Sequence, residues 1–476
     1  MPPTKYEKKR KRSAASTPAS QKSQNQNDAP SIQKKKQRKQ FSDSPSSPPP
    51  MKKKGFNKQV PRSRKPSRAR SSYSHQSRVS LLIENRKSKS GRRKNRSPTP
   101  ESSPEASPVN YLSPGNVYVD ENHHLEVRPN DVIDHKFKVV DICGAGTFGR
   151  VYKVRDLTDP YSDTFLALKV MQDKDEARQD TVYEREALQG LMAKDPKHIQ
   201  NVVRFFGHFA YHGHACLLFE HLGPSLHKFL HTTKSNFVPF PMHQLSEITQ
   251  QTCLALAFLR KCGYSHTDIK TENIVFAEEV TYHDTIYLSD SSQTLVRELS
   301  CTNVKLIDFG SAIDDEEDHG TDISTRQYRA PEIMLVLDWN HQIDMWSLGC
   351  VLFEVYSGKV LFQAPTVKAQ IVAMTRILGP IPKKMLSRVP HDHKYFKNGE
   401  FRASDSYRQS PEYMDVMRTA KPLKEYFRNL ESTDSKRFLD LLRKFLQYEP
   451  KKRITAADAL YHEFLSQRIS RKRKQM

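Results

Sequence analysis

The stretch "YSHTDIKTENIVF", Tyr264–Phe276, crowds five polar side chains into eight residues ahead of an apolar end. These side chains are His266, Asp268, Lys270, Glu272 and Asn273. A plain buried strand or helix would leave several of them without hydrogen-bond partners, at a considerable cost in free energy. The stretch is therefore predicted to be a loop that carries chemistry.

The order of the side chains in this loop fits phosphoryl transfer. Asp268 can accept the proton of an attacking hydroxyl group, and Lys270 can steady the transferring phosphoryl group. Asn273 can hold a magnesium ion together with Asp308, which lies farther along the chain in "LIDFG". The motif "APE", Ala330–Glu332, follows. Together these parts would position a substrate and neutralise charge, which is most of what phosphoryl transfer requires.

The segment "GAGTFGRV", Gly144–Val151, contains the pattern G-x-G-x-x-G. The pattern alone also occurs in dinucleotide-binding folds, where a helix follows the glycines. Here "FKVVDI" precedes the glycines and "RVYKV" follows them, so strand residues flank them on both sides. We therefore predict a β-hairpin that covers the phosphates of a nucleotide. The expected nucleotide-binding residues in it are Gly144, Ala145, Gly146, Thr147, Phe148, Gly149 and Val151.

Lys169 ends the strand-like segment "LALK" and is a candidate ligand of the α- and β-phosphates. A single lysine on a strand is more often a solvated charge, so this interpretation depends on the glycine hairpin before it. Such a lysine needs an orienting carboxylate, and the helical segment "YEREALQGL" offers Glu184 and Glu186. Glu184 shares a helix face with Leu188 and Leu191, so we expect Glu184 to point inward.

The positive charge is concentrated at the start of the chain. Residues 1–110 hold 29 Lys and Arg against 6 Asp and Glu, whereas the other residues hold 48 of each kind. This segment is rich in Ser, Pro and Gln and poor in apolar residues, which is typical of disorder. We predict a disordered basic tail over 1–135, a folded domain over 136–466 and a short basic tail over 467–476. Basic runs are often only solvated, but several in one tail favour import into the nucleus, with the cytoplasm as a further location.

The cysteines and the hydropathy of the sequence also bear on the class of protein. Six cysteines are scattered without a C-x-x-C pair, which favours reduced thiols. No run approaches 18 apolar residues, and the first residues lack the apolar core of a secretory signal. We expect a monomer without a membrane segment.

Two kinds of segment follow one another along the predicted domain. Strand-like patterns fill "FKVVDICGAGTFGRVYKVRD" and "TFLALKVM". Farther on the apolar spacing becomes helical, as in the stripe formed by Leu245, Ile248, Thr252, Leu256 and Leu259. "DMWSLGCVLFEVYSG", Asp344–Gly358, is apolar almost all round and predicts a helix buried in a large core. The predicted fold class is α+β, with a small β-rich lobe followed by a larger helical lobe.

Taken together, these motifs resemble those of the eukaryotic protein kinases over residues 136–466. The resemblance implies the bilobal protein-kinase fold, ATP and Mg²⁺ as cofactors, and protein substrates. It also implies a buried carboxylate at Asp344 on the central helix, and a pair formed by Glu332 and Arg453. Further nucleotide-binding residues that it implies are Ala167, Glu220 and Leu222, around a hinge that follows Phe219.

The stretch "SHTDIKTENIVF" resembles more closely the "HTDLKPEN" form of the LAMMER (CDC-like) kinases, in which Thr stands where most kinases have Arg. That arginine normally binds a phosphate on the activation segment. Thr267 cannot do so, and the resemblance therefore implies activity without such a phosphate. "STRQYRAPE", the insert at 277–302 and "KPLKE" also resemble this family. The chain departs from it at Thr271, where proline is usual, and at "AQIVAMTRILG", where the family has "EHLAMMERILG".

The preferred interpretation is an active Ser/Thr kinase, with dual specificity for Tyr as in its relatives, that acts on Arg/Ser-rich nuclear proteins of RNA processing. The acidic run "DDEEDHGTD", Asp314–Asp322, would attract arginines near the peptide site, unless it is only a solvated loop. A kinase-shaped scaffold with little catalysis is the alternative function, although Lys169, Asp268 and Asp308 are all present. Weak, salt-sensitive contact of the tail with nucleic acid is another alternative.

Overall fold

The computed structural model describes residues 118–466, apart from 147–148, 160, 233–236, 290–291, 316–319 and 321–322. Residues 1–117 of the tail predicted over 1–135, and the short basic tail predicted over 467–476, lie outside the described residues, so the disorder predicted for 1–117 stays a prediction. Thr147 and Phe148 of the glycine segment also lie outside the described residues, as do 316–319 and 321–322 of the acidic run.

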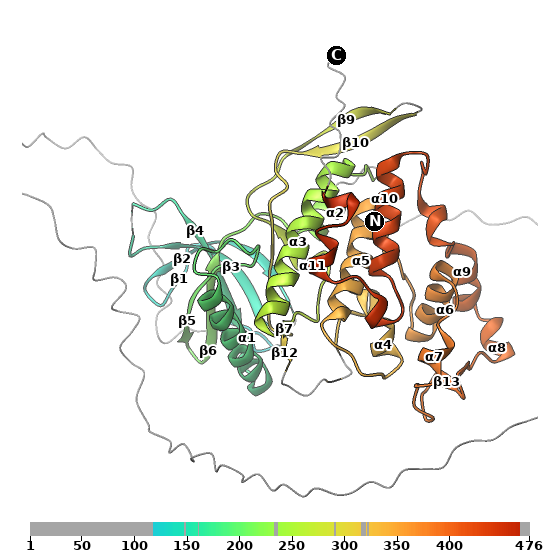
Figure 1. Cartoon of the computed structure of the whole chain (residues 1–476). Coiled ribbons are helices and arrows are strands. Elements are labelled where there is room, and N and C mark those ends of the chain that lie inside the picture. The colour runs from blue at the N-terminus through green and yellow to red at the C-terminus, as the bar shows by residue number, and fades with distance from the viewer. Residues whose placement is uncertain are drawn as a thin grey trace, which may run out of the picture. The chain divides into compact units, whose positions relative to one another are not determined.

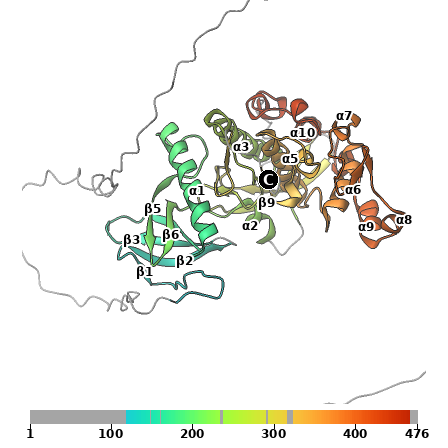
Figure 2. The same cartoon turned by 90° about the horizontal axis from the view of Figure 1, so that it is seen from below.

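The smaller lobe is an antiparallel sheet of six strands in the order β1-β2-β3-β4-β6-β5, against which α1 packs (Figures 1 and 2). Its elements are β1 Val132–Ile133, β2 Phe137–Ala145, β3 Gly149–Asp156, β4 Phe165–Met171, α1 Asp175–Lys194, β5 Phe205–Tyr211 and β6 His214–Glu220. Alternate side chains of the strands enter a small core, because a pleated strand points them to opposite faces. The predicted hairpin is β2 and β3, and the predicted β-rich lobe is confirmed.

The smaller lobe begins earlier than the sequence predicts. Residues 118–135, assigned above to the tail, pack on the sheet. Val119 pairs with Leu125 in an isolated β-bridge, and Leu125 and Ile133 are buried at 2% and 0% exposure. Asp120 forms an ion pair with Arg150 of β3 at 2.6 Å. Residues 118–135 are therefore ordered against the sheet and are not part of a disordered tail, because their few apolar side chains have places in the small core.

The larger lobe is mainly helical (Figure 1). Its α-helices are α2 Leu226–Thr232, α3 Met242–Cys262, α4 Pro331–Met334, α5 Gln342–Ser357, α6 Val367–Leu378, α7 Lys383–Leu386, α8 Asp405–Arg408, α9 Pro411–Thr419, α10 Thr433–Phe445, α11 Ala456–Ala459 and α12 Glu463–Ser466. The 3-10 helices are η3 Arg326–Tyr328, η4 Leu423–Tyr426 and η5 Pro450–Lys452. The stripe predicted between Leu245 and Leu259 lies on α3, and all five of its side chains are buried.

Short strand pairs hold the loops of the larger lobe. They are β7 Tyr264–Ser265 with β12 Ile313–Asp314, β8 Ile274–Phe276 with β11 Val304–Leu306, β9 Tyr282–Ser289 with β10 Ser292–Leu299, and β13 Phe396–Lys397 with β14 Glu400–Phe401. Strands β7 and β8 form the two ends of the stretch Tyr264–Phe276, and the polar residues between them lie in a loop, as predicted. The insert at 277–302 folds mainly as the β9–β10 hairpin.

Helix α5 forms the centre of the larger lobe, and its side chains are buried on nearly all sides, as predicted. Gly349 lets α10 approach closely, because a Cβ atom there would lie 2.9 Å from Cβ of Phe445. Trp346 stacks on Phe362 with ring centroids 5.6 Å apart. Gly358 ends the helix in the left-handed conformation, with φ 70°. Helix α5 is thus a fixed support for the loops around it.

All six cysteines are free, and four of them are buried. Among the described residues, no helix has both the length and the apolar character that crossing a membrane requires.

A buried ion pair joins Arg453, directly after η5, to Glu332 of α4. Arg453 donates from Nη1 and Nη2 to the two carboxylate oxygens of Glu332, at 2.8 and 3.0 Å. The side chains are 0% and 1% exposed. Arg453 also donates to the carbonyl oxygen of Gln342, at the start of α5. This is the pair that the kinase resemblance implies, and its burial makes the loss of either partner costly.

We expect Arg453→Met to lower the free energy of unfolding by about 3–5 kcal/mol, because it leaves the Glu332 carboxylate buried without its partner. Denaturant unfolding followed by circular dichroism measures this. Arg418→Met is the control, since Arg418 forms an exposed pair with Asp415 and its loss should cost less than about 1 kcal/mol. Equal losses in the two variants would contradict the structural role of the buried pair.

Candidate active site

The loop 266–273 is anchored to α5 by one carboxylate. Asp344 accepts hydrogen bonds from the backbone N–H groups of His266 at 2.8 Å and of Thr267 at 2.9 Å. Asp344 is only 3% exposed, so both bonds form where water does not compete. The position of the loop is therefore set by the core helix of the larger lobe.

Thr267 connects this loop to the segment that follows "LIDFG". It adopts a left-handed backbone conformation with φ 66° and is 0% exposed. Its hydroxyl donates to the carbonyl oxygen of Ser311 at 2.6 Å, and its own carbonyl oxygen accepts from the hydroxyl of Ser324 at 2.6 Å. The threonine thus holds both ends of the segment by direct hydrogen bonds.

The carboxylate of Asp268 has a donor at each oxygen. Lys270 Nζ donates to Oδ2 at 2.6 Å, and Thr325 donates to Oδ1 from its backbone N–H and its hydroxyl, at 3.0 and 2.7 Å. Burial alone would raise the pKa of Asp268, but these bonds lower it below its ordinary value. Thr325 could not be recognised as a site residue from its own position in the sequence, where its only signal is its place in the "STR" motif.

Lys169 lies between two carboxylates. Its Nζ donates to both oxygens of Glu184 and to Oδ1 of Asp308, each at 2.9 Å. Burial alone would lower the pKa of Lys169, but the two carboxylates raise it above its usual value. The charge of Lys169 in turn lowers the pKa of Asp308 to about 2. Glu184 on α1 is therefore placed beside the lysine, whereas the alternative Glu186 is 61% exposed.

The two candidate metal ligands lie on adjoining loops. The backbone N–H of Ile307 donates to the carbonyl oxygen of Asn273 at 3.0 Å, immediately before Asp308 in the sequence. The amide of Asn273 donates to the carbonyl oxygen of Asp268 at 2.9 Å, which fixes its orientation. An amide oxygen and a carboxylate are hard oxygen ligands of the kind that Mg²⁺ prefers.

The candidate nucleotide-binding residues lie on neighbouring strands. Val151 of β3 pairs with Lys169 of β4, and Ala167 pairs with Phe219 at the end of β6. Gly149 has no room for a side chain, because a Cβ atom would lie 2.7 Å from the carbonyl oxygen of Val170.

The remaining glycine residues and the hinge complete this region. Gly146 donates from its N–H to the carbonyl oxygen of Gly149 at 2.9 Å, and Gly144 and Ala145 end β2. Glu220 accepts from Lys305 Nζ at 2.6 Å, so its carboxylate is used to hold the hinge. Leu222 packs against the large core.

The described start of the acidic run is held in place. Asp314 lies in β12, which pairs with β7 directly before the loop 266–273. Asp315 forms an ion pair with Arg260 of α3, and its backbone N–H donates to the carbonyl oxygen of Gly263 at 2.8 Å. These two acidic residues are therefore part of the packed structure.

Comparison with known proteins identifies the family to which the chain belongs. The sequence matches the family model "Protein kinase domain" over residues 137–465. The structure is similar to the crystal structure of a kinase domain, with a TM-score of 0.65 and 31% sequence identity, covering 73% of this chain and 100% of that one.

The curated relatives indicate the group within this family to which the chain is similar. The chain is 38% identical to the serine/threonine-protein kinase Doa of Drosophila melanogaster, over 72% of this chain and 40% of Doa. It is 37% identical to the dual specificity protein kinase CLK2 of Mus musculus, over 73% of this chain and 67% of CLK2. The match therefore spans less than half of Doa and about two thirds of CLK2. The chain belongs to the protein kinase family, as a divergent member of its LAMMER (CDC-like) group.

Proposed function

We propose that this chain is an active protein kinase that transfers the γ-phosphate of ATP, with Mg²⁺ as cofactor, to Ser and Thr of protein substrates, and also to Tyr. The observation that carries the proposal is Lys169, bonded to both Glu184 and Asp308 at 2.9 Å. This arrangement supports catalysis better than a scaffold role. It places the Lys169 ammonium group, which can bind phosphate, beside the Asp308 carboxylate, which can bind a metal ion.

On the nucleotide side, the hairpin from Gly144 to Val151 covers the phosphates, and Lys169 binds the α- and β-phosphates. Glu184 keeps the ammonium group aimed at them. Asn273 and Asp308 hold Mg²⁺, which neutralises phosphate charge when bound. Ala167, Glu220 and Leu222 are proposed to border the adenine.

On the transfer side, Asp268 orients the hydroxyl group of the substrate and accepts its proton. Its lowered pKa keeps it ionised at neutral pH, so positioning is its main contribution. Lys270 is bonded to Asp268 at 2.6 Å and is placed to steady the charge of the transferring group. Thr325 holds the other carboxylate oxygen and thereby fixes the direction of the base.

For the substrate class we propose Arg/Ser-rich proteins of RNA processing. The support is electrostatic: the acidic run continues from Asp314 and Asp315 to Glu316, Glu317 and Asp318, which would attract arginines. Asp315 is already paired with Arg260, so the later residues of the run supply the attraction in this proposal. The dual specificity in the name of CLK2 supports Tyr as a further acceptor.

For location and partners we propose a monomer that works mainly in the nucleus. The basic runs of the N-terminal segment support import, and its positive charge would also allow weak contact with nucleic acid.

Asp268→Asn should lower kcat by about 10²–10⁴-fold, the usual range for loss of a general base, while the melting temperature stays close to that of the wild type. Steady-state assays with magnesium ATP and an Arg-Ser peptide measure this. Asp415→Asn, on the exposed side of α9, is the control. A near-normal kcat in Asp268→Asn would favour the scaffold alternative.

Removal of phosphate should leave the activity unchanged. Thr267 holds the activation segment through Ser311 and Ser324 without any phosphate. We expect bacterially expressed chain to phosphorylate an Arg-Ser peptide at the same rate before and after phosphatase treatment, with complete dephosphorylation verified by mass spectrometry. A fall in rate after treatment would show that the segment depends on a phosphate after all.

Reversing the charge of the acidic run should weaken peptide binding. The triple change Glu316→Lys, Glu317→Lys and Asp318→Lys should raise KM for an Arg-Ser peptide, leave KM for ATP unchanged, and reduce the salt dependence of the peptide KM. A triple reversal at Glu400, Glu425 and Glu431, which are exposed elsewhere on the larger lobe, is the matched control. An unchanged peptide KM would make the run a solvated loop.

A further inference from the structure

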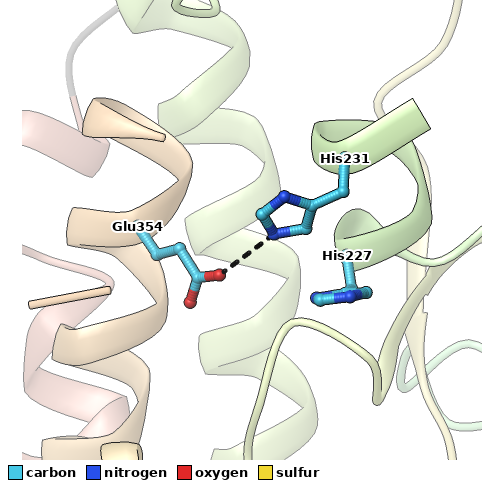
Figure 3. Close-up of side chains that lie close together, drawn as sticks. All are labelled: His227, His231 and Glu354. Atoms are coloured by element: carbon cyan, nitrogen blue, oxygen red, sulfur yellow. Dashed lines mark ion pairs between the residues drawn. The ribbon is translucent and has the colours of Figure 1, made fainter. Parts of the chain in front are cut away.

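Apart from the residues proposed for phosphoryl transfer, His227, His231 and Glu354 face one another between α2 and α5 (Figure 3). Nε2 of His231 lies 3.8 Å from Oε1 of Glu354. One ligand atom from each of the three side chains lies within 4.8 Å of the other two. Two imidazole rings and a carboxylate therefore converge on one point.

The two histidines come from one face of α2. They are four residues apart, which places both rings on the same side of a helix, and the ring centroids are 4.4 Å apart. Two histidines at this spacing are a recurrent pair of zinc ligands. The side chains of His227 and His231 are 43% and 50% exposed, so both rings are reachable from solvent. Nδ1 of His227 also lies 3.5 Å from Oε1 of Glu272, so this ring would have to leave that carboxylate or share it with the metal.

Glu354 is the buried member of the cluster. Its side chain is 2% exposed, and within the described residues its ion-pair partner is the half-exposed His231. Tyr328 donates its hydroxyl to Oε2 at 2.6 Å, which orients the carboxylate. A buried carboxylate is costly without a compensating positive charge, and one neutral hydroxyl does not supply it.

The elements that carry the three side chains are held by other bonds. The backbone N–H of His227 donates to the carbonyl oxygen of Thr271 at 3.0 Å. The hydroxyl of Thr271 lies 3.3 Å from that of Tyr328, which in turn holds Glu354. The three candidate ligands are thus positioned by contacts outside their own set, as supporting residues do at metal sites.

We propose that His227, His231 and Glu354 bind a zinc ion, with water at a fourth position that opens to solvent. Imidazole nitrogens suit Zn²⁺, whereas Mg²⁺ prefers oxygen ligands, and a His-His-Glu set is one that zinc uses when it keeps an open position. Bonds of about 2.0–2.2 Å at tetrahedral angles place ligand atoms about 3.4 Å apart, so the partly exposed rings need to move by only about 1 Å. The site goes beyond the proposed kinase function and does not depend on it.

The simpler alternative is an ion pair without metal. A protonated His231 would then neutralise Glu354, and His227 would face the carboxylate of Glu272, whose Oε1 lies 3.5 Å from its Nδ1. Under this alternative, loss of the histidines changes stability but leaves zinc binding as it was, so a direct binding measurement separates the two.

The test is a calorimetric titration of the full chain with Zn²⁺, after removal of metals with a chelator and in excess Mg²⁺. We expect the wild type to bind one Zn²⁺ more than the double variant His227→Ala/His231→Ala, and to gain melting temperature with Zn²⁺ that the variant does not gain. Glu354→Gln keeps the shape and can still accept from Tyr328. It should weaken binding at least about 10-fold, since loss of a ligand should cost no less than loss of a supporting partner.

His283→Ala is the matched control, because His283 also faces a carboxylate, that of Glu298 at 3.6 Å, but has no second histidine in that pair. It should bind Zn²⁺ as the wild type does. Circular dichroism without metal establishes that each variant is folded, and His231→Asn replaces the double variant if the latter does not fold. Equal zinc affinity and stoichiometry in the wild type, the histidine variants and Glu354→Gln would overturn the proposal.

Discussion

The two hydrogen bonds that Asp344 accepts from the backbone of His266 and Thr267 support the rest of the candidate active site. Burial raises the pKa of Asp344, and the nearby His266 and the two N–H groups offset only part of this increase by favouring the charged form. The carboxylate belongs to a helix that is packed on nearly all sides. The loop bonded to it is therefore held in a fixed position by the core. The positions of Asp268, Lys270 and Asn273 all follow from where this loop is fixed.

The anchoring of the loop also stabilises an unfavourable backbone conformation at Thr267. A β-branched residue with φ 66° is unfavourable by about 1–3 kcal/mol, and it persists only where its surroundings fix it. Here Asp344, Ser311 and Ser324 all bond to the same residue. An arginine at this position would reach outward to a phosphate, whereas the short hydroxyl reaches the backbone of the activation segment itself.

The sequence predicted those features that depend on local pattern. The helices of the larger lobe, the glycine hairpin and the inward side of Glu184 follow from periodicity within a few turns or strands. Other features depend on contacts across long separations: Thr325 is 57 residues from Asp268 and His231 is far from Glu354 in the chain. The packing of 118–135 was missed because a few apolar residues, among them Leu125 and Ile133, are enough once a sheet is present to receive them.

The charges of the site explain why its parts depend on one another. Lys169 and Lys270 face three carboxylates, those of Glu184, Asp308 and Asp268, so these five side chains together carry one negative charge. A divalent cation would reverse that balance and leave the site ready for the anionic phosphates of a nucleotide. Lys169 is the member that joins the two lobes, because Glu184 lies on α1 and Asp308 follows β11. Loss of Lys169 would therefore remove a phosphate ligand and also leave two like charges facing each other across the lobes.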